Sequence, residues 1–198
     1  MPARIQFTAN AIPGLVGSGQ RAAQTLFHEG GHAAHFANVD MPAPCFGQEF
    51  APTSVGFSET QSMFLDSFLD DPAWQRRYAA DGAGTAMPLA LVERGIETRQ
   101  PFAAFGARAM LAVCYAERAL YEIPDEELAG RGGAERALAA VRDVERRLLF
   151  LERGSPRPVL SVPHLLSGDS SAYYHGYVLA EMAVEDTDNR LEAFKTSL

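Results

Sequence analysis

Cysteine and tryptophan are scarce in this 198-residue sequence, which has two cysteines and one tryptophan. Cys45 and Cys114 do not form a C-x-x-C pair, so the sequence offers neither a thiolate zinc site nor a disulfide framework. Structural disulfides are typical of oxidising compartments and are rare in the cytosol. We therefore expect a reduced cytoplasmic protein.

Basic residues and long hydrophobic runs are also scarce. The chain has 17 lysines and arginines against 25 acidic residues, a net charge of −8, which disfavours binding to nucleic acid or to anionic membranes. Its longest apolar stretch, FAAFGARAMLAVCY, is short and interrupted by Arg108, so no segment is expected to span a bilayer. The opening MPARIQFTANAIPG has no basic region followed by a long apolar core, so no secretory signal is expected.

The overall composition, 47% hydrophobic and 21% charged residues, is typical of a globular protein. We expect residues 1–198 to form a single domain. Apolar periodicity predicts a mainly α fold with at most a small strand, RIQFTANA, near the N-terminus. Ser58 is expected to cap the second helix, and Pro72 and Pro101 to mark a new first turn and a kink. The helices are expected at about 20–39, 58–71, 88–122, 133–152 and 170–197.

The segment FHEGGHAAH, residues 27–35, concentrates three histidines and one glutamate in a helical pattern. His28 and His32 are four residues apart, so a helix places both imidazoles on one face. In an H-E-x-x-H motif they bind zinc and the glutamate, here Glu29, is the general base. Gly30 and Gly31 each cost a helix about 1 kcal/mol relative to alanine, which suggests close approach of another segment or a substrate. The alternative is a metal-free helix with solvated polar groups.

A catalytic zinc site needs a third protein ligand, for which Glu49 and Glu59 are candidates. We favour Glu59, because packed apolar positions of the second helix can hold it, although the helix dipole also favours a glutamate in a first turn. Asp66 could orient a ligand histidine, but a solvated aspartate is the simpler interpretation. His35 is too far along the helix for the same ion and is interpreted as structural.

Several segments resemble the M3 family of zinc peptidases, the thimet oligopeptidase and oligoendopeptidase F group. LFHEGGHAAHF is followed by FSETQS, with Glu59 27 residues after His32, and later by VPHLLSGDSSAYYHGYVLAEMA. The segment before the zinc helix and the intervening helices are similar in character, so the resemblance covers nearly the whole chain. It implies a helical catalytic domain that cleaves internal bonds of short peptides.

The resemblance also implies roles for individual residues. His28, His32 and Glu59 would bind one zinc ion, and Glu29 would activate the water. Tyr174 and Tyr177 would donate hydrogen bonds to the oxyanion of the tetrahedral intermediate, and His164 would contact the substrate.

Three departures from the family pattern affect these assignments. Gln61 stands where the family usually has proline, and Asp169 and Ser170 stand where it often has another tyrosine. The loop after His164 is one residue longer, which makes Tyr173 a possible substitute for Tyr174. On the resemblance, we expect the chain to correspond to the catalytic half of the family architecture, without the N-terminal helical half.

Three other functions stay open. A zinc-binding but inactive module would dock with a separate N-terminal-half chain or self-associate. A zinc carboxypeptidase of related fold would release single C-terminal residues, and a metal-free helical domain would hold no zinc. Cobalt or manganese could occupy the same ligands.

Overall fold

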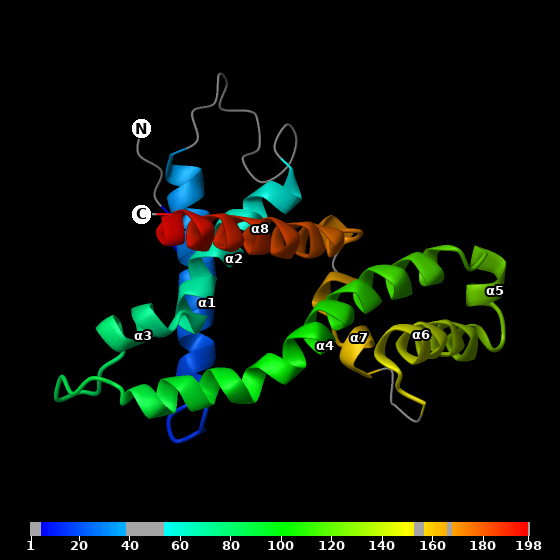
Figure 1. Ribbon diagram of the computed structural model, residues 1–198. Helices are drawn as coiled ribbons and strands as arrows, with labels where there is room; N and C mark the ends of the chain where they lie inside the picture. The colour runs from blue at the N-terminus through cyan, green and yellow to red at the C-terminus, as the bar shows by residue number, and fades with distance from the viewer. Residues whose placement is uncertain (1–4, 39–53, 153–156, 166–167, 198) are drawn as a thin grey trace. The chain divides into compact units, whose positions relative to one another are not determined.

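The computed structural model describes residues 5–38, 54–152, 157–165 and 168–197, and these are mainly helical, which confirms the expected fold class (Figure 1). The α-helices are α1 Ser18–Ala37, α2 Val55–Ser67, α3 Pro72–Tyr78, α4 Leu89–Tyr121, α5 Asp125–Ala129, α6 Gly133–Leu149, α7 Arg157–Leu160 and α8 His175–Ser197. Three 3₁₀ turns, η1 Phe68–Asp70, η2 Pro163–Leu165 and η3 Gly168–Ser170, lie between them.

The strand anticipated at residues 4–11 does not form in the part of that segment that the structure describes. Residues 5–12 have no regular structure, and within the described ranges β pairing is limited to an isolated bridge between Ala80 and Ala86. An extended segment needs a neighbouring strand to bond its peptide groups. The alternating apolar and polar residues of one short segment predict an extended backbone but do not provide a partner strand.

The chain divides into two compact units. The first unit comprises residues 1–99 and 179–198, and the second comprises residues 100–178. One boundary therefore falls inside α4 beside Pro101, a residue that removes a backbone hydrogen bond from a helix. The other falls inside α8, after its first turn.

In the first unit, α1 and α2 pack closely at Gly31. An added Cβ on Gly31 would lie 2.5 Å from the Cα of Ser62 and 2.6 Å from the carbonyl oxygen of Gln61. Only glycine permits this approach of two helix backbones. The close-approach explanation for glycine at this position is thus confirmed, whereas a Cβ on Gly30 would meet only the Cδ2 of Leu65, at 3.8 Å.

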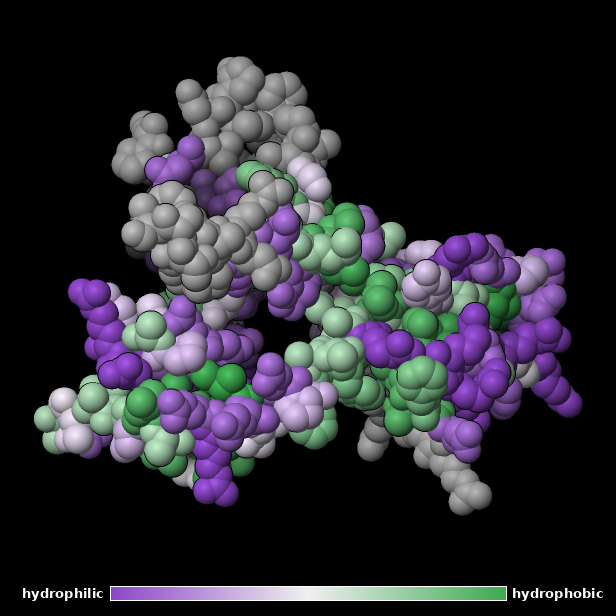
Figure 2. All heavy atoms as spheres, in the orientation of Figure 1, coloured by the Kyte–Doolittle hydropathy of each residue, from purple (hydrophilic) through white to green (hydrophobic). Residues whose placement is uncertain are grey.

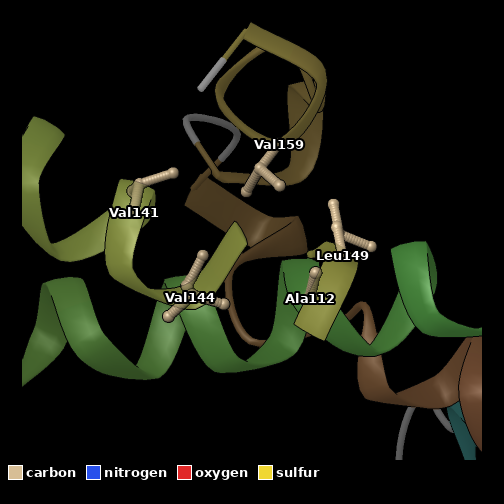
Figure 3. Packing of buried hydrophobic residues seen from close by; sticks show 6 residues of the cluster. Ala112, Val141, Val144, Leu149 and Val159 are labelled. Carbon is tan, nitrogen blue, oxygen red and sulfur yellow. The ribbon is translucent and has the colours of Figure 1, made fainter. Parts of the chain in front are cut away.

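The second unit has its own hydrophobic core, which joins α4, α6 and α7. Small side chains on α4 meet branched side chains on α6, and Val159 of α7 lies between Val141 and Leu149 (Figure 3). The buried members are Ala112, Ala116, Val141, Val144, Leu149 and Val159. This packing holds the α4 segment that carries Glu117.

The helix starts partly differ from the expected ones. Asp71 accepts a hydrogen bond from the backbone N–H of Trp74, at 2.8 Å, with Pro72 at the first helical position, so the first turn expected at Pro72 is confirmed. The expectation that Ser58 caps the second helix is wrong. That helix begins at Val55, and Ser58 is fully buried within it.

The last helix begins five residues later than expected, at His175 rather than residue 170. Ala172 has a φ of 55°, a left-handed conformation that a right-handed helix cannot continue. The residues before it form the η3 turn.

Candidate metal centre

Three side chains of the first unit converge at the crossing of α1 and α2. The Nε2 atoms of His28 and His32 lie 3.3 Å and 3.4 Å from the same oxygen, Oε2 of Glu59. One ligand atom from each residue lies within 4.8 Å of the other two. Donors that bind zinc tetrahedrally at about 2.0–2.1 Å are roughly 3.3 Å apart. The group is therefore positioned to hold a metal ion.

Glu59 is the most deeply buried member of this group, with 2% of its surface exposed. Its Oε2 lies 3.0 Å from the hydroxyl of Ser62, which is itself fully buried. Removing a carboxylate from water is costly unless positive charge compensates it. A cation held between Glu59 and the two imidazoles would supply that charge. Glu59 lies in the second turn of α2, so the first-turn interpretation of this glutamate is wrong.

Both histidines have a partner on the ring nitrogen that faces away from Glu59. Nδ1 of His28 lies 3.0 Å from Oδ2 of Asp66, and Nδ1 of His32 lies 3.4 Å from the hydroxyl of Ser58. An Nδ1–H that donates to Asp66 or to Ser58 would fix each ring and leave Nε2 free to bind a metal ion, a common arrangement around bound metals. The interpretation of Asp66 as a solvated side chain is wrong, because it orients His28.

The charges around His28 favour its protonated form in the metal-free chain. Burial of the ring acts to lower its pKa, but the hydrogen bond to Asp66 and then the nearby Glu59 carboxylate raise the pKa of His28 to about 9. A proton on Nε2 of His28 then lies between this nitrogen and Oε2 of Glu59, where a metal ion would bind. Metal and proton therefore compete for one nitrogen.

Two other members of the motif lie on α1 outside this group. Glu29 is half-buried and directly follows His28. His35 packs against aromatic rings, with its centroid 5.2 Å from that of Phe36 and 5.4 Å from that of Phe57. Burial, and then the nearby His32, lower the pKa of His35, so it is a neutral packing residue. Glu49, the other candidate for third ligand, lies outside the described residues.

The three residues expected to act on substrate cluster in the second unit. The hydroxyl of Tyr177 lies 3.3 Å from Nε2 of His164, and the ring of His164 lies 5.5 Å from those of Tyr173, Tyr174 and Tyr177, centroid to centroid. Burial raises the pKa of Tyr174, with a smaller contribution from Cys114. The Tyr174 phenol therefore keeps its proton and remains a hydrogen-bond donor at neutral pH.

Glu117 on α4 holds the segment that precedes these tyrosines, a role that the sequence pattern did not predict. Its carboxylate is 6% exposed and accepts hydrogen bonds from the backbone N–H of Ala172, at 2.6 Å, and from the hydroxyl of Tyr121, at 2.9 Å. The first of these bonds anchors Ala172, which has a left-handed conformation, immediately before Tyr173. The sequence holds one indication of this role, because Glu117 directly follows Ala116, which belongs to the buried apolar positions of α4. A carboxylate buried at such a position needs hydrogen-bond partners.

Comparisons of the chain with protein-family models, with curated proteins and with solved structures found no match. Within the described ranges, no helix is long and apolar enough to cross a membrane. The structure thus shows a mainly helical protein with a His–His–Glu group positioned to hold a metal ion.

Proposed function

We propose that the chain is a zinc-dependent metallopeptidase that hydrolyses internal bonds of short peptides. The observation that carries this proposal is the convergence of His28, His32 and Glu59 at the spacing of tetrahedral ligands. The resemblance of the flanking segments to the M3 peptidases supplies the reaction class.

Zinc is the ion that suits this donor set best. Two imidazoles and one carboxylate are typical zinc ligands, whereas calcium and magnesium prefer oxygen donors alone. The group has three members among the residues that the structure describes. Structural zinc sites use four protein ligands, and catalytic sites use three and keep one position open. The His–His–Glu composition of this group matches a three-ligand set that catalytic zinc sites use.

When bound, zinc supplies Lewis acidity that polarises a substrate carbonyl and acidifies water. Glu29 accepts the water proton and delivers it to the nitrogen of the leaving amine, as a general base and then a general acid. Asp66 and Ser58 keep the His28 and His32 rings in their metal-binding orientation. On the resemblance, Tyr174 and Tyr177 donate hydrogen bonds to the oxyanion and His164 contacts the substrate.

Cleavage of internally quenched peptides by the zinc-loaded chain, with Glu29→Gln as a paired variant, tests this function. We expect internal cleavage by the parent chain and a loss of at least about a hundredfold in kcat in the variant, with zinc content unchanged. Release of single C-terminal residues would instead identify a carboxypeptidase. Cleavage that survives in Glu29→Gln, or a purified chain that takes up no zinc, would refute the proposal.

A second candidate function is a zinc-binding module without activity that associates with a partner chain. It is favoured by the exposed aromatic side chains on α4 in the second unit, since Phe102 is 67% and Phe105 is 45% exposed. Large exposed apolar patches often mark interaction sites. Stoichiometric zinc without peptide cleavage, together with concentration-dependent association lost in Phe102→Ser, would support this candidate.

A further inference from the structure

A largely apolar cavity of about 810 Å³ lies in the first unit, and none of the three candidate metal ligands lines it. It is lined by one face of α1, by α3 and the turn after it, and by the N-terminal part of α4. Phe27 and Trp74 form one wall, with their rings 5.2 Å apart, centroid to centroid, in an edge-to-face contact. Small-molecule sites have volumes of about 300–1,000 Å³ and are mainly apolar. This cavity therefore has the size of a ligand site.

Small residues on the facing helices create this space. Gly19 on α1 and Gly95 on α4 both line the cavity, and an added Cβ at either position would have nothing within 4 Å. Gly19 and Phe27 on α1 are eight residue steps apart, which corresponds to about 12 Å at 1.5 Å per residue. The cavity is therefore elongated along the helix and fits a chain-like apolar group.

Hydrophobic side chains reach the surface at this cavity. Figure 2 shows hydrophobic residues over the beginning of α4, where Met87 is 41% and Leu91 is 59% exposed, and both line the cavity. Apolar surface left in contact with water is stabilised by burial against an apolar ligand. An occupant with an apolar body would supply that burial.

The charge of the cavity is opposite to that of the whole chain. The net charge of the chain is −8, yet none of the described residues that line the cavity is acidic, and its charged members are Arg94 and Arg99. Nη2 of Arg99 lies 2.8 Å from Oδ1 of Asp70. Arg94 is exposed and, among the described residues, has no ion-pair partner. Arg94 is thus available to an anionic group of a ligand.

We propose that this cavity binds a small amphiphilic anion, a medium-chain fatty carboxylate. Its alkyl chain lies between α1 and α4 against Phe27 and Trp74, and its carboxylate pairs with Arg94. This ligand site is additional to the metal centre, and the proposal does not depend on peptidase activity.

Trp74 is the sole tryptophan of the sequence, so its fluorescence reports directly on the cavity. We expect a saturable change in Trp74 emission when octanoate, decanoate or dodecanoate is added below its micellar concentration. Each added methylene should strengthen binding roughly fourfold until the cavity is filled. Decanol, with the same chain and no charge, should bind more weakly than decanoate.

Two pairs of variants locate the ligand. Gly95→Leu should fill the cavity and abolish the response, whereas Gly106→Leu, also on α4 with nothing within 4 Å of an added Cβ, should not. Both changes replace a helical glycine by a good helix former, so folding is preserved, and circular dichroism verifies this. Arg94→Gln should weaken decanoate binding roughly three- to fivefold. Arg131→Gln is the control, because Arg131 is also exposed and does not line the cavity.

Three results would overturn the proposal. They are a Trp74 signal that does not saturate, equal affinity in Gly95→Leu and Gly106→Leu, and equal affinity for decanoate and decanol. Self-association that changes Trp74 emission with protein concentration alone would assign the cavity to a second copy of the chain instead.

Discussion

The backbone of Ser62 occupies the place that a side chain on Gly31 would need. A Cβ on Gly31 would lie 2.5 Å from the Cα of Ser62, well inside van der Waals contact. This approach brings α2 against α1 at the level where His28 and His32 face Glu59. The missing side chain therefore sets the distance between the metal ligands of the two helices.

Gly31→Ala should accordingly disturb both stability and the metal centre. We expect a loss of about 1–3 kcal/mol, because the added methyl group forces the two backbones apart. Zinc affinity should fall as Glu59 moves away from the histidines. Gly30→Ala is the matched control and should be neutral or stabilising, since its Cβ meets only Leu65 at 3.8 Å. Chemical denaturation and zinc titration measure both effects, and equal behaviour of the two variants would contradict the prediction.

Asp66→Asn should weaken zinc binding without removing a ligand. An asparagine can still contact Nδ1 of His28 but no longer supplies a carboxylate to orient and polarise the ring. Loss of such a partner typically costs about 10–100-fold in metal affinity. Competition with a chromogenic chelator measures the affinity. Asp70→Asn, on the neighbouring turn η1 with an exposed side chain, is the control, and unchanged affinity in Asp66→Asn would contradict the prediction.

Protonation of His28 should make the stability of the metal-free chain depend on pH. The pKa of His28 is raised from 6.5 to about 9 in the folded chain, so the folded state binds this proton more tightly than the unfolded state. The stabilising effect of this protonation is fully present below about pH 6.5 and is lost as the pH rises through about 9. Denaturation in a chelator between pH 6 and 10 measures it. The loss should shrink in Asp66→Asn, and a rise in stability over this range would contradict the prediction.

Glu117→Ala should destabilise the segment that leads into the tyrosine cluster. The change leaves the N–H of Ala172 and the hydroxyl of Tyr121 without their acceptor, at a cost of about 1–3 kcal/mol. Amide exchange at Ala172 should become faster, which hydrogen-exchange mass spectrometry measures. Glu122→Ala, whose side chain is 62% exposed, should cost less than about 0.5 kcal/mol. If exchange at residues 172–177 is the same in both variants, Glu117 does not anchor this segment.

Local sequence patterns anticipated the longer helices, though not the short helices α5 and α7, and one half of the candidate site. Four-residue spacing places His28 and His32 on one face of any helix, whatever surrounds it. Pro72 after Asp71 has the chemistry of a helix start regardless of the rest of the fold. The choice of Glu59 rested on the expectation that packing would hold it, and the helix that carries it was anticipated three residues too late. Periodicity marks a helix well but leaves its first turn uncertain.

The sequence by itself thus determined what depends on neighbours within about one helical turn: the helical segments and the paired imidazoles. Only the tertiary structure decided that Gly31 admits the backbone of α2, that Asp66 orients His28 and that Glu117 anchors Ala172 across 55 residues. It also decided that the N-terminal alternating segment pairs with no strand in the described ranges. These features depend on contacts between segments distant in the chain, and hydrogen bonding and burial at such contacts are set by packing rather than by local spacing.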